Sequence, residues 1–87
     1  MEPIEVQTLE GLLRLDPPVL ELFRNDGRQG AWRLHATLVT EIEQERRSDR
    51  IQVRFHTTPK FYESAEVAFE NEPLLQSLLS ALAAARL

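Results

Sequence analysis

A short turn signal near the middle of the chain most constrains how the sequence folds. Asp26 and Gly27 form a step that supplies the positive φ of a tight reversal, and Gly30 follows three residues later. Apolar residues recur on both sides of this turn, in residues 18–22 and 32–38. The two flanking segments therefore predict a pair of antiparallel strands whose register depends on Gly27 and Gly30.

The segments before this turn are less uniform. Residues 4–7 alternate between apolar and polar and predict a short strand. Residues 9–15 contain leucines at helical spacing, but Gly11 and the following Asp-Pro-Pro limit a helix to about two turns, so helix and strand both remain open. A helix over residues 17–25 is conceivable as well. We prefer a strand there, because the segment after the turn alternates so regularly.

The second half of the chain shows clearer alternation. From Trp32 to Ile42 the apolar residues occupy even positions, which predicts one long strand with one dry face and one mostly polar face. A polar turn at residues 45–50 follows, and residues 51–55 alternate again. After a turn containing proline, residues 65–69 form the last predicted strand.

A helix is expected at the end of the chain. Asn71 suits a helix cap and Pro73 suits a first turn. One apolar stripe follows at helical spacing: Leu74, Leu75, Leu78, Leu79 and Leu82. The fold class we expect is therefore α+β, with one twisted antiparallel sheet of four to five strands covered by a single C-terminal helix, in one domain spanning residues 1–87.

Charge is distributed unevenly along the chain. The net charge is −4, yet residues 24–60 carry a balance of +3 between two acidic ends. Arginine accounts for nearly all the basic residues, and its planar guanidinium can pair with carboxylates in a bidentate way. Six arginines of the two central hairpins are the candidate partner-binding residues: Arg28, Arg33, Arg46, Arg47, Arg50 and Arg54.

The residues give no sign of a catalytic site. The chain has no cysteine, and its serines lack a plausible His–acid arrangement. His35 and His56 with a carboxylate such as Glu41 are conceivable metal ligands, but solvent-facing strand residues are the simpler interpretation. Arg54 opposite Glu41 or Glu43 predicts a cross-strand ion pair. We therefore assign no catalytic, cofactor-binding or metal-binding residue.

Several short motifs resemble one known family. They are Ile4-Glu5-Val6, Gly11, Pro18, Leu22-Phe23-Arg24, Asp26-Gly27-Arg28-Gln29-Gly30, Trp32-Arg33-Leu34, Arg54-Phe55, Pro59, Ala65-Glu66-Val67-Ala68-Phe69 and the helix from Pro73. In this order and spacing they are similar to the small photosystem II assembly-factor family, also known as photosystem II reaction-centre protein W. Two features differ: the family's middle segment is missing or shortened between Ala36 and Arg50, and Leu and Ala replace its aromatic-rich helix.

The resemblance implies a non-enzymatic protein that docks on the cytoplasmic face of a photosystem II assembly intermediate. It implies a cytoplasmic location, peripheral to the thylakoid membrane, and cytoplasmic loops of a membrane complex as partners. An exposed sheet edge that accepts a partner strand needs no special side-chain motif, which fits a chain without a visible site. The alternatives are a small nucleic-acid-binding regulator, disfavoured because acids interleave with the arginines, and another soluble adaptor that modulates an enzyme.

Overall fold

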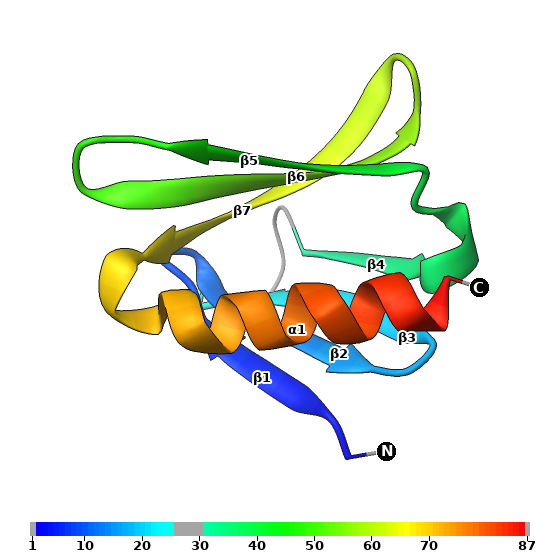
Figure 1. Ribbon diagram of the computed structural model, residues 1–87, viewed down its shortest axis with the longest axis horizontal. Coiled ribbons are helices and arrows are strands. Elements are labelled where there is room, and N and C mark those ends of the chain that lie inside the picture. Colours follow the sequence, from blue (N-terminus) through cyan, green and yellow to red (C-terminus); the bar gives the residue numbers. More distant parts are fainter. Residues whose placement is uncertain (1, 26–30, 87) are drawn as a thin grey trace.

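The computed structural model describes residues 2–25 and 31–86 and contains two antiparallel sheets and a C-terminal helix (Figure 1). Sheet A consists, in order, of β1 (Ile4–Gln7), β2 (Gly11–Asp16), β3 (Val19–Arg24) and β4 (Trp32–His35). Sheet B consists of β5 (Glu41–Arg46), β6 (Arg50–Thr58) and β7 (Phe61–Ala68). The helical segments are the 3₁₀ turns η1 (Ala36–Leu38) and η2 (Phe69–Asn71) and the helix α1 (Glu72–Ala85).

The α+β class, the antiparallel pairing and the C-terminal helix are confirmed. The strands are divided between two sheets, however, whereas the sequence predicted one. Figure 1 shows sheet B lying over sheet A, with α1 running along one open side of the pair. Over residues 2–25 and 31–86, no helix combines the length and the apolar character needed to cross a membrane.

The short turn η1 is the reason for the second sheet, because it breaks the long strand predicted after Trp32. The His35 side chain accepts the N–H of Thr37 at 3.2 Å, a local hydrogen bond that favours a turn over extended backbone. Beyond the turn Val39 is buried, while Leu38 is 55% exposed. The prediction of one continuous strand is therefore wrong: the two-residue alternation is interrupted at Val39, where the chain passes from sheet A to sheet B.

The hairpin predicted around the central turn is confirmed by its strands. β3 pairs antiparallel with β4, with Leu22 opposite Trp32. Gly27 and Gly30 themselves lie outside the described residues. Most of residues 9–15, for which helix and strand were both open, belong to strand β2. The strand preferred over a helix in residues 17–25 is confirmed as β3.

The turn between β1 and β2 closes tightly on itself. Thr8 donates its N–H to the carbonyl of Gly11 at 2.9 Å and accepts the Gly11 N–H at Oγ1, also at 2.9 Å. Gly11 also packs directly against β3: a Cβ built on it would lie 1.9 Å from the carbonyl oxygen of Phe23. Only glycine allows the backbones to approach this closely.

The same turn joins sheet A to sheet B. Leu9 donates its N–H to the carbonyl of Glu66 in β7 at 2.8 Å. The carboxylate of Glu10 accepts the Glu66 N–H, at 3.1 and 3.2 Å to its two oxygens. Both outward backbone groups of Glu66 are therefore satisfied by one turn of the other sheet.

The hydrophobic core lies between the two sheets and α1. The strands contribute their inward side chains: Val6, Leu13, Leu15, Leu20, Leu22, Ile51, Val53, Phe55, Ala65 and Val67. From α1, four leucines of the predicted stripe are buried: Leu75, Leu78, Leu79 and Leu82. The fifth, Leu74, is 51% exposed, so its inclusion in the stripe was wrong. The helix turns it away from the sheets.

The start of the helix differs in detail from the prediction. Pro73 lies in the first turn, as expected. Asn71 occupies the cap position, but its side chain makes no capping bond and instead donates to the carbonyl of Gln7 at 3.3 Å. Phe69, expected on the dry face of a strand, lies in η2 and is 37% exposed. The last strand therefore ends one residue earlier than the alternation indicated.

Truncating a buried helix leucine tests whether α1 is an integral part of the core. Leu78 is fully buried, so Leu78→Ala should lower the free energy of unfolding by about 2–5 kcal/mol. Leu74→Ala, the same change on the exposed side of the helix, should alter it by less than about 0.5 kcal/mol. Urea unfolding followed by circular dichroism measures both. Equal effects would mean that the helix does not pack as described.

Adding one methyl group at Gly11 tests the turn that joins the sheets. Gly11→Ala should destabilise the protein by about 1–3 kcal/mol, because the new Cβ forces β2 away from Phe23. The displacement should also move the amide signal of Glu66, which is bonded to the same turn. Thermal unfolding and a ¹⁵N–¹H NMR spectrum measure the two effects. An unchanged midpoint would contradict the close approach.

Candidate functional site

The outer face of sheet B carries most of the charged side chains that the sequence singles out. β5 contributes three alternate glutamates, which pair in register with residues of β6 as Glu41–His56, Glu43–Arg54 and Glu45–Gln52. The apolar side chains Ile42 and Phe55 pair on the inner face, whereas the alternation allowed Ile42 to lie opposite either Val53 or Phe55. The predicted cross-strand ion pair is confirmed for Glu43, whose carboxylate lies 3.8 Å from Arg54.

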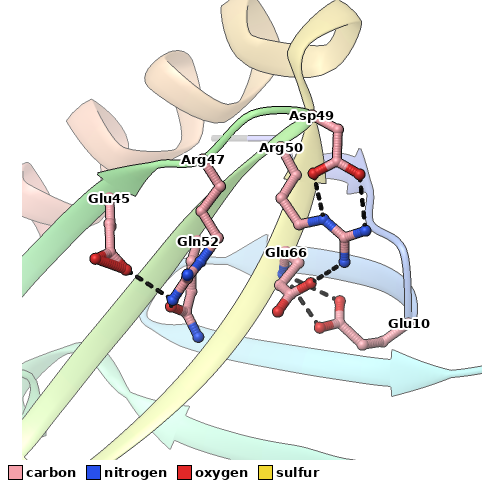
Figure 2. Close-up of polar contacts among 7 residues, drawn as sticks. All are labelled: Glu10, Glu45, Arg47, Asp49, Arg50, Gln52 and Glu66. Atoms are coloured by element: carbon pink, nitrogen blue, oxygen red, sulfur yellow. Dashed lines mark hydrogen bonds and ion pairs between the residues drawn. The ribbon is translucent and has the colours of Figure 1, made fainter.

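Arg47 and Arg54 share the same two acceptors. Arg54 donates through Nη2 to Glu45 at 3.2 Å and to Gln52 at 3.0 Å. Arg47 Nη2 lies 2.8 Å from Glu45 and 2.9 Å from Gln52 (Figure 2). Each guanidinium is thus already neutralised by a neighbour on the sheet, and exposed pairs of this kind contribute little to stability.

Arg50 lies between two carboxylates. It donates through Nε and Nη2 to the two oxygens of Asp49, both at 3.0 Å, and through Nη1 to Glu66 at 2.5 Å (Figure 2). The hydrogen bonds from Arg50 hold the pKa of Asp49 below its ordinary value, and those to Asp49 and Glu66 raise the pKa of Arg50. Since Glu66 is also held by Glu10, Arg50 belongs to the junction between the sheets.

Arg46 connects β5 to the start of α1. Its Nη1 lies 2.6 Å from the carboxylate of Glu72, and its guanidinium lies 4.9 Å from the centre of the Phe69 ring. One helical turn further, Gln76 donates to Gln44 at 2.6 Å. The helix therefore runs alongside β5 and is held there by polar side-chain contacts.

The six arginines predicted to bind a partner do not form one surface. Four lie on sheet B: Arg46, Arg47, Arg50 and Arg54. Arg33 is exposed on β4 of sheet A, opposite Glu21, on the face turned away from sheet B. Arg28 lies outside the described residues. The arginines that the structure brings together are all paired with carboxylates, a feature that charge counting along the sequence does not detect.

Three potential metal ligands meet at one end of β5. The ligand atoms of Glu41, Glu43 and His56 lie within 4.8 Å of one another. His56 Nε2 contacts the carboxylate of Glu43, so these groups already satisfy one another as a cross-strand pair. His35, the other candidate, lies in sheet A and hydrogen-bonds to Thr37, so the two histidines are not brought together. We assign no metal to these residues.

The two edges of sheet B are treated differently by the rest of the chain. Along β7 the outward backbone groups of Glu66 bond to the turn of sheet A described above. The indole Nε1 of Trp32 donates to the carbonyl of Ser64 at 3.3 Å. This edge is therefore covered over the part that faces sheet A.

The edge formed by β5 is open. Arg47 donates its N–H to the carbonyl of Arg50 at 2.8 Å, and the antiparallel ladder then alternates along the strand. The backbone groups of Ile42, Gln44 and Arg46 consequently point away from β6. Among the described residues, no other backbone or side chain hydrogen-bonds to them. β5 thus presents a row of unpaired donors and acceptors, the feature to which another strand can pair.

A signal for this open edge is present in the sequence, although alternation alone misses it. A strand packed on one face shows apolar residues at every second position, as β6 does. In β5 only Ile42 follows this rule, because Gln44 and Arg46 occupy inner-face positions and are exposed. Polar residues on both faces indicate a strand that extends beyond the core.

Comparison with models of known protein families, with curated proteins and with solved structures finds no match for the chain.

Replacing Arg50 should raise the pKa of Asp49 toward that of a free side chain. In the wild type, hydrogen bonds from Arg50 favour the carboxylate, so Asp49 should titrate below its ordinary value near 3.8. Any stability that this pair adds is present above that ordinary value and is lost as the pH falls through the lowered pKa. Carboxyl NMR titration of wild type and Arg50→Gln measures the shift. Arg47→Gln is the control, because Arg47 bonds to Glu45 and Gln52 instead; an equal pKa in all three proteins would contradict the pairing.

Proposed function

We propose that the protein is a non-enzymatic binding module that acts by accepting a segment of a partner protein as an added strand. The observation that carries this proposal is the open edge of β5, where the backbone of Ile42, Gln44 and Arg46 is unpaired while the edge of β7 is covered. Strand addition derives affinity from main-chain hydrogen bonds and selectivity from neighbouring side chains. A protein of this kind needs neither a deep cleft nor a catalytic constellation.

The position of α1 favours this edge over the others. Glu72 contacts Arg46, and Gln76 contacts Gln44. The helix therefore lies beside β5. A strand added here gains side-chain contacts with the helix as well as backbone bonds with β5.

The arginines take a secondary part in this proposal. Arg46, Arg47 and Arg54 lie next to the edge, and each is paired with a carboxylate of the chain itself. An exposed arginine that already has such a partner gains little free energy from a further ion pair. These side chains therefore adjust selectivity, and the backbone supplies most of the affinity.

We further propose a photosystem II assembly intermediate as the partner, with the protein docking on its cytoplasmic face and lying peripheral to the thylakoid membrane. This part of the proposal is supported by the resemblance of the sequence motifs described above. The non-enzymatic role is supported by the lack of a nucleophile–base arrangement in the sequence. A nucleic-acid-binding role is less favoured, because carboxylates neutralise the sheet B arginines that a phosphate backbone would need.

Two substitutions at Gln44 test the role of the β5 edge. Gln44→Pro removes one outward N–H and should weaken partner recovery about fivefold or more, the equivalent of roughly one hydrogen bond. Gln44→Thr keeps the N–H and loses the same contact with Gln76, so its recovery should equal that of the wild type. Tagged proteins are captured from the cells that make them, and photosystem II subunits are quantified by mass spectrometry.

The outcomes of this capture experiment separate the two parts of the proposal. Equal recovery with Gln44→Pro and Gln44→Thr would show that the edge is not used. If Gln44→Pro, but not Gln44→Thr, weakens recovery of a protein unrelated to photosystem II, the proposed partner is overturned, while the proposed strand addition stands. Circular dichroism of both variants confirms that each remains folded, since proline is tolerated on an edge strand with its N–H side facing solvent.

A further inference from the structure

The open edge of sheet B is lined by acidic side chains on its outer face. Glu41, Glu43 and Glu45 follow one another at every second residue, and all three are exposed. The basic residues that contact Glu43 and Glu45 lie either on the neighbouring strand β6, as Arg54 does, or in the turn between β5 and β6. Glu41 makes no ion pair with any described residue. The side chains of Glu43 and Glu45 are still 45% and 46% exposed, so they can also interact with charges on an added strand.

This row selects against a second copy of the chain. In any antiparallel pairing of two β5 strands that joins their outward backbone groups, residues of the outer face meet residues of the outer face. Centred on Gln44, the pairing sets Glu43 opposite Glu45 of the second copy; centred on Glu43, it sets that residue opposite itself. Like charges directly opposite each other destabilise a strand pair. The edge thus resists self-association while its backbone remains unpaired.

We propose that the occupant of the β5 edge is an extended segment in which Lys or Arg recurs at every second residue, an inference that rests on the proposed function. Such a segment places its basic side chains directly opposite Glu41, Glu43 and Glu45, while the intervening residues face Ile42, Gln44 and Arg46. The same charges that repel a second copy thereby attract the partner. Cytoplasmic segments of membrane proteins are rich in Lys and Arg, which agrees with the partner proposed above.

The geometry also says which backbone groups of the segment are used. We infer an antiparallel orientation, because every strand pair in the described sheets is antiparallel. In that orientation the residues opposite Ile42, Gln44 and Arg46 exchange hydrogen bonds with them. The basic residues fall between these pairs and direct their N–H groups away. Affinity therefore depends on the backbone of the intervening residues and on the side chains of the basic ones.

A peptide titration of the ¹⁵N-labelled full chain tests this inference. The probe is the capped peptide Thr-Lys-Val-Lys-Val-Lys-Thr, and a second peptide carries Glu in place of each Lys. A third has the same composition as the probe with its lysines adjacent to one another. We expect the probe to shift the amide signals of Ile42, Gln44 and Arg46 and to bind about tenfold more tightly than either control peptide. Added salt should lower the affinity of the probe for the protein, because it screens the attraction between Lys and Glu.

Backbone methylation separates pairing at the edge from simple charge attraction. N-methylation of the Val and N-terminal Thr residues should abolish binding, since it blocks the N–H groups aimed at β5. N-methylation of the Lys residues, with the same number of methyl groups, should leave the affinity within about twofold. If both methylated peptides bind as well as the probe, or if both fail equally, the proposed edge pairing is overturned.

Substitutions in the protein test the acidic row. Replacing Glu41, Glu43 and Glu45 together by Gln should weaken the probe about tenfold, and replacing them by Asp should preserve most of the affinity. Glu2→Gln is the control, an exposed acid that precedes β1 of sheet A. If all three peptides bind with the same affinity and remain sensitive to backbone methylation, the proposal of a Lys- or Arg-containing segment is overturned, while strand addition at β5 stands. If none shifts β5, both are overturned.

Discussion

The structure depends on one junction, the turn of residues 8–11 bonded to Glu66. Leu9 and Glu10 satisfy both outward backbone groups of Glu66, and Arg50 neutralises its carboxylate. Gly11 allows the turn to sit directly on β3, where any larger residue would collide with a carbonyl oxygen. These contacts hold sheet A against β7, so that the edge on this side of sheet B is covered. By the same arrangement, β5 becomes the edge of sheet B that sheet A does not cover.

Much of the fold follows from local patterns in the sequence. The alternation of Ile51, Val53 and Phe55 indicates the central strand of sheet B. Pairing its dry face with Ile42 leaves two registers, and the structure has the one with Ile42 opposite Phe55. The leucine stripe indicates the helix and its buried side. These patterns are reliable because each residue's environment is set by its immediate neighbours along one element.

The division into two sheets could not be predicted in this way. Alternation describes which side of a strand is dry. Apolar residues occupy even positions from Trp32 to Leu38 and again at Ile42, with only Val39 and Thr40 out of phase, although the chain turns a corner at η1. The corner depends on the His35 side chain bonding to the backbone of Thr37, and on where sheet A ends. Arg50 and Glu66, similarly, are distant in the sequence and meet only through the pairing of β6 with β7. The charge balance along the sequence therefore treated these arginines as free, although the fold pairs them with carboxylates.

The candidate site was hidden for a related physical reason. A site made of backbone donors and acceptors has no residue signature, because every residue except proline carries the same groups. What the sequence records is how the edge is controlled: Gln44 and Arg46 keep the inner face polar, and the glutamates of the outer face repel one another across a self-pair. In the proposed pairing, protection from aggregation and selection of a partner come from the same side chains. A strand that only needed protection could have been shortened, or covered as β7 is by the turn of residues 8–11. Charged side chains instead leave the backbone of β5 available to a segment of opposite charge.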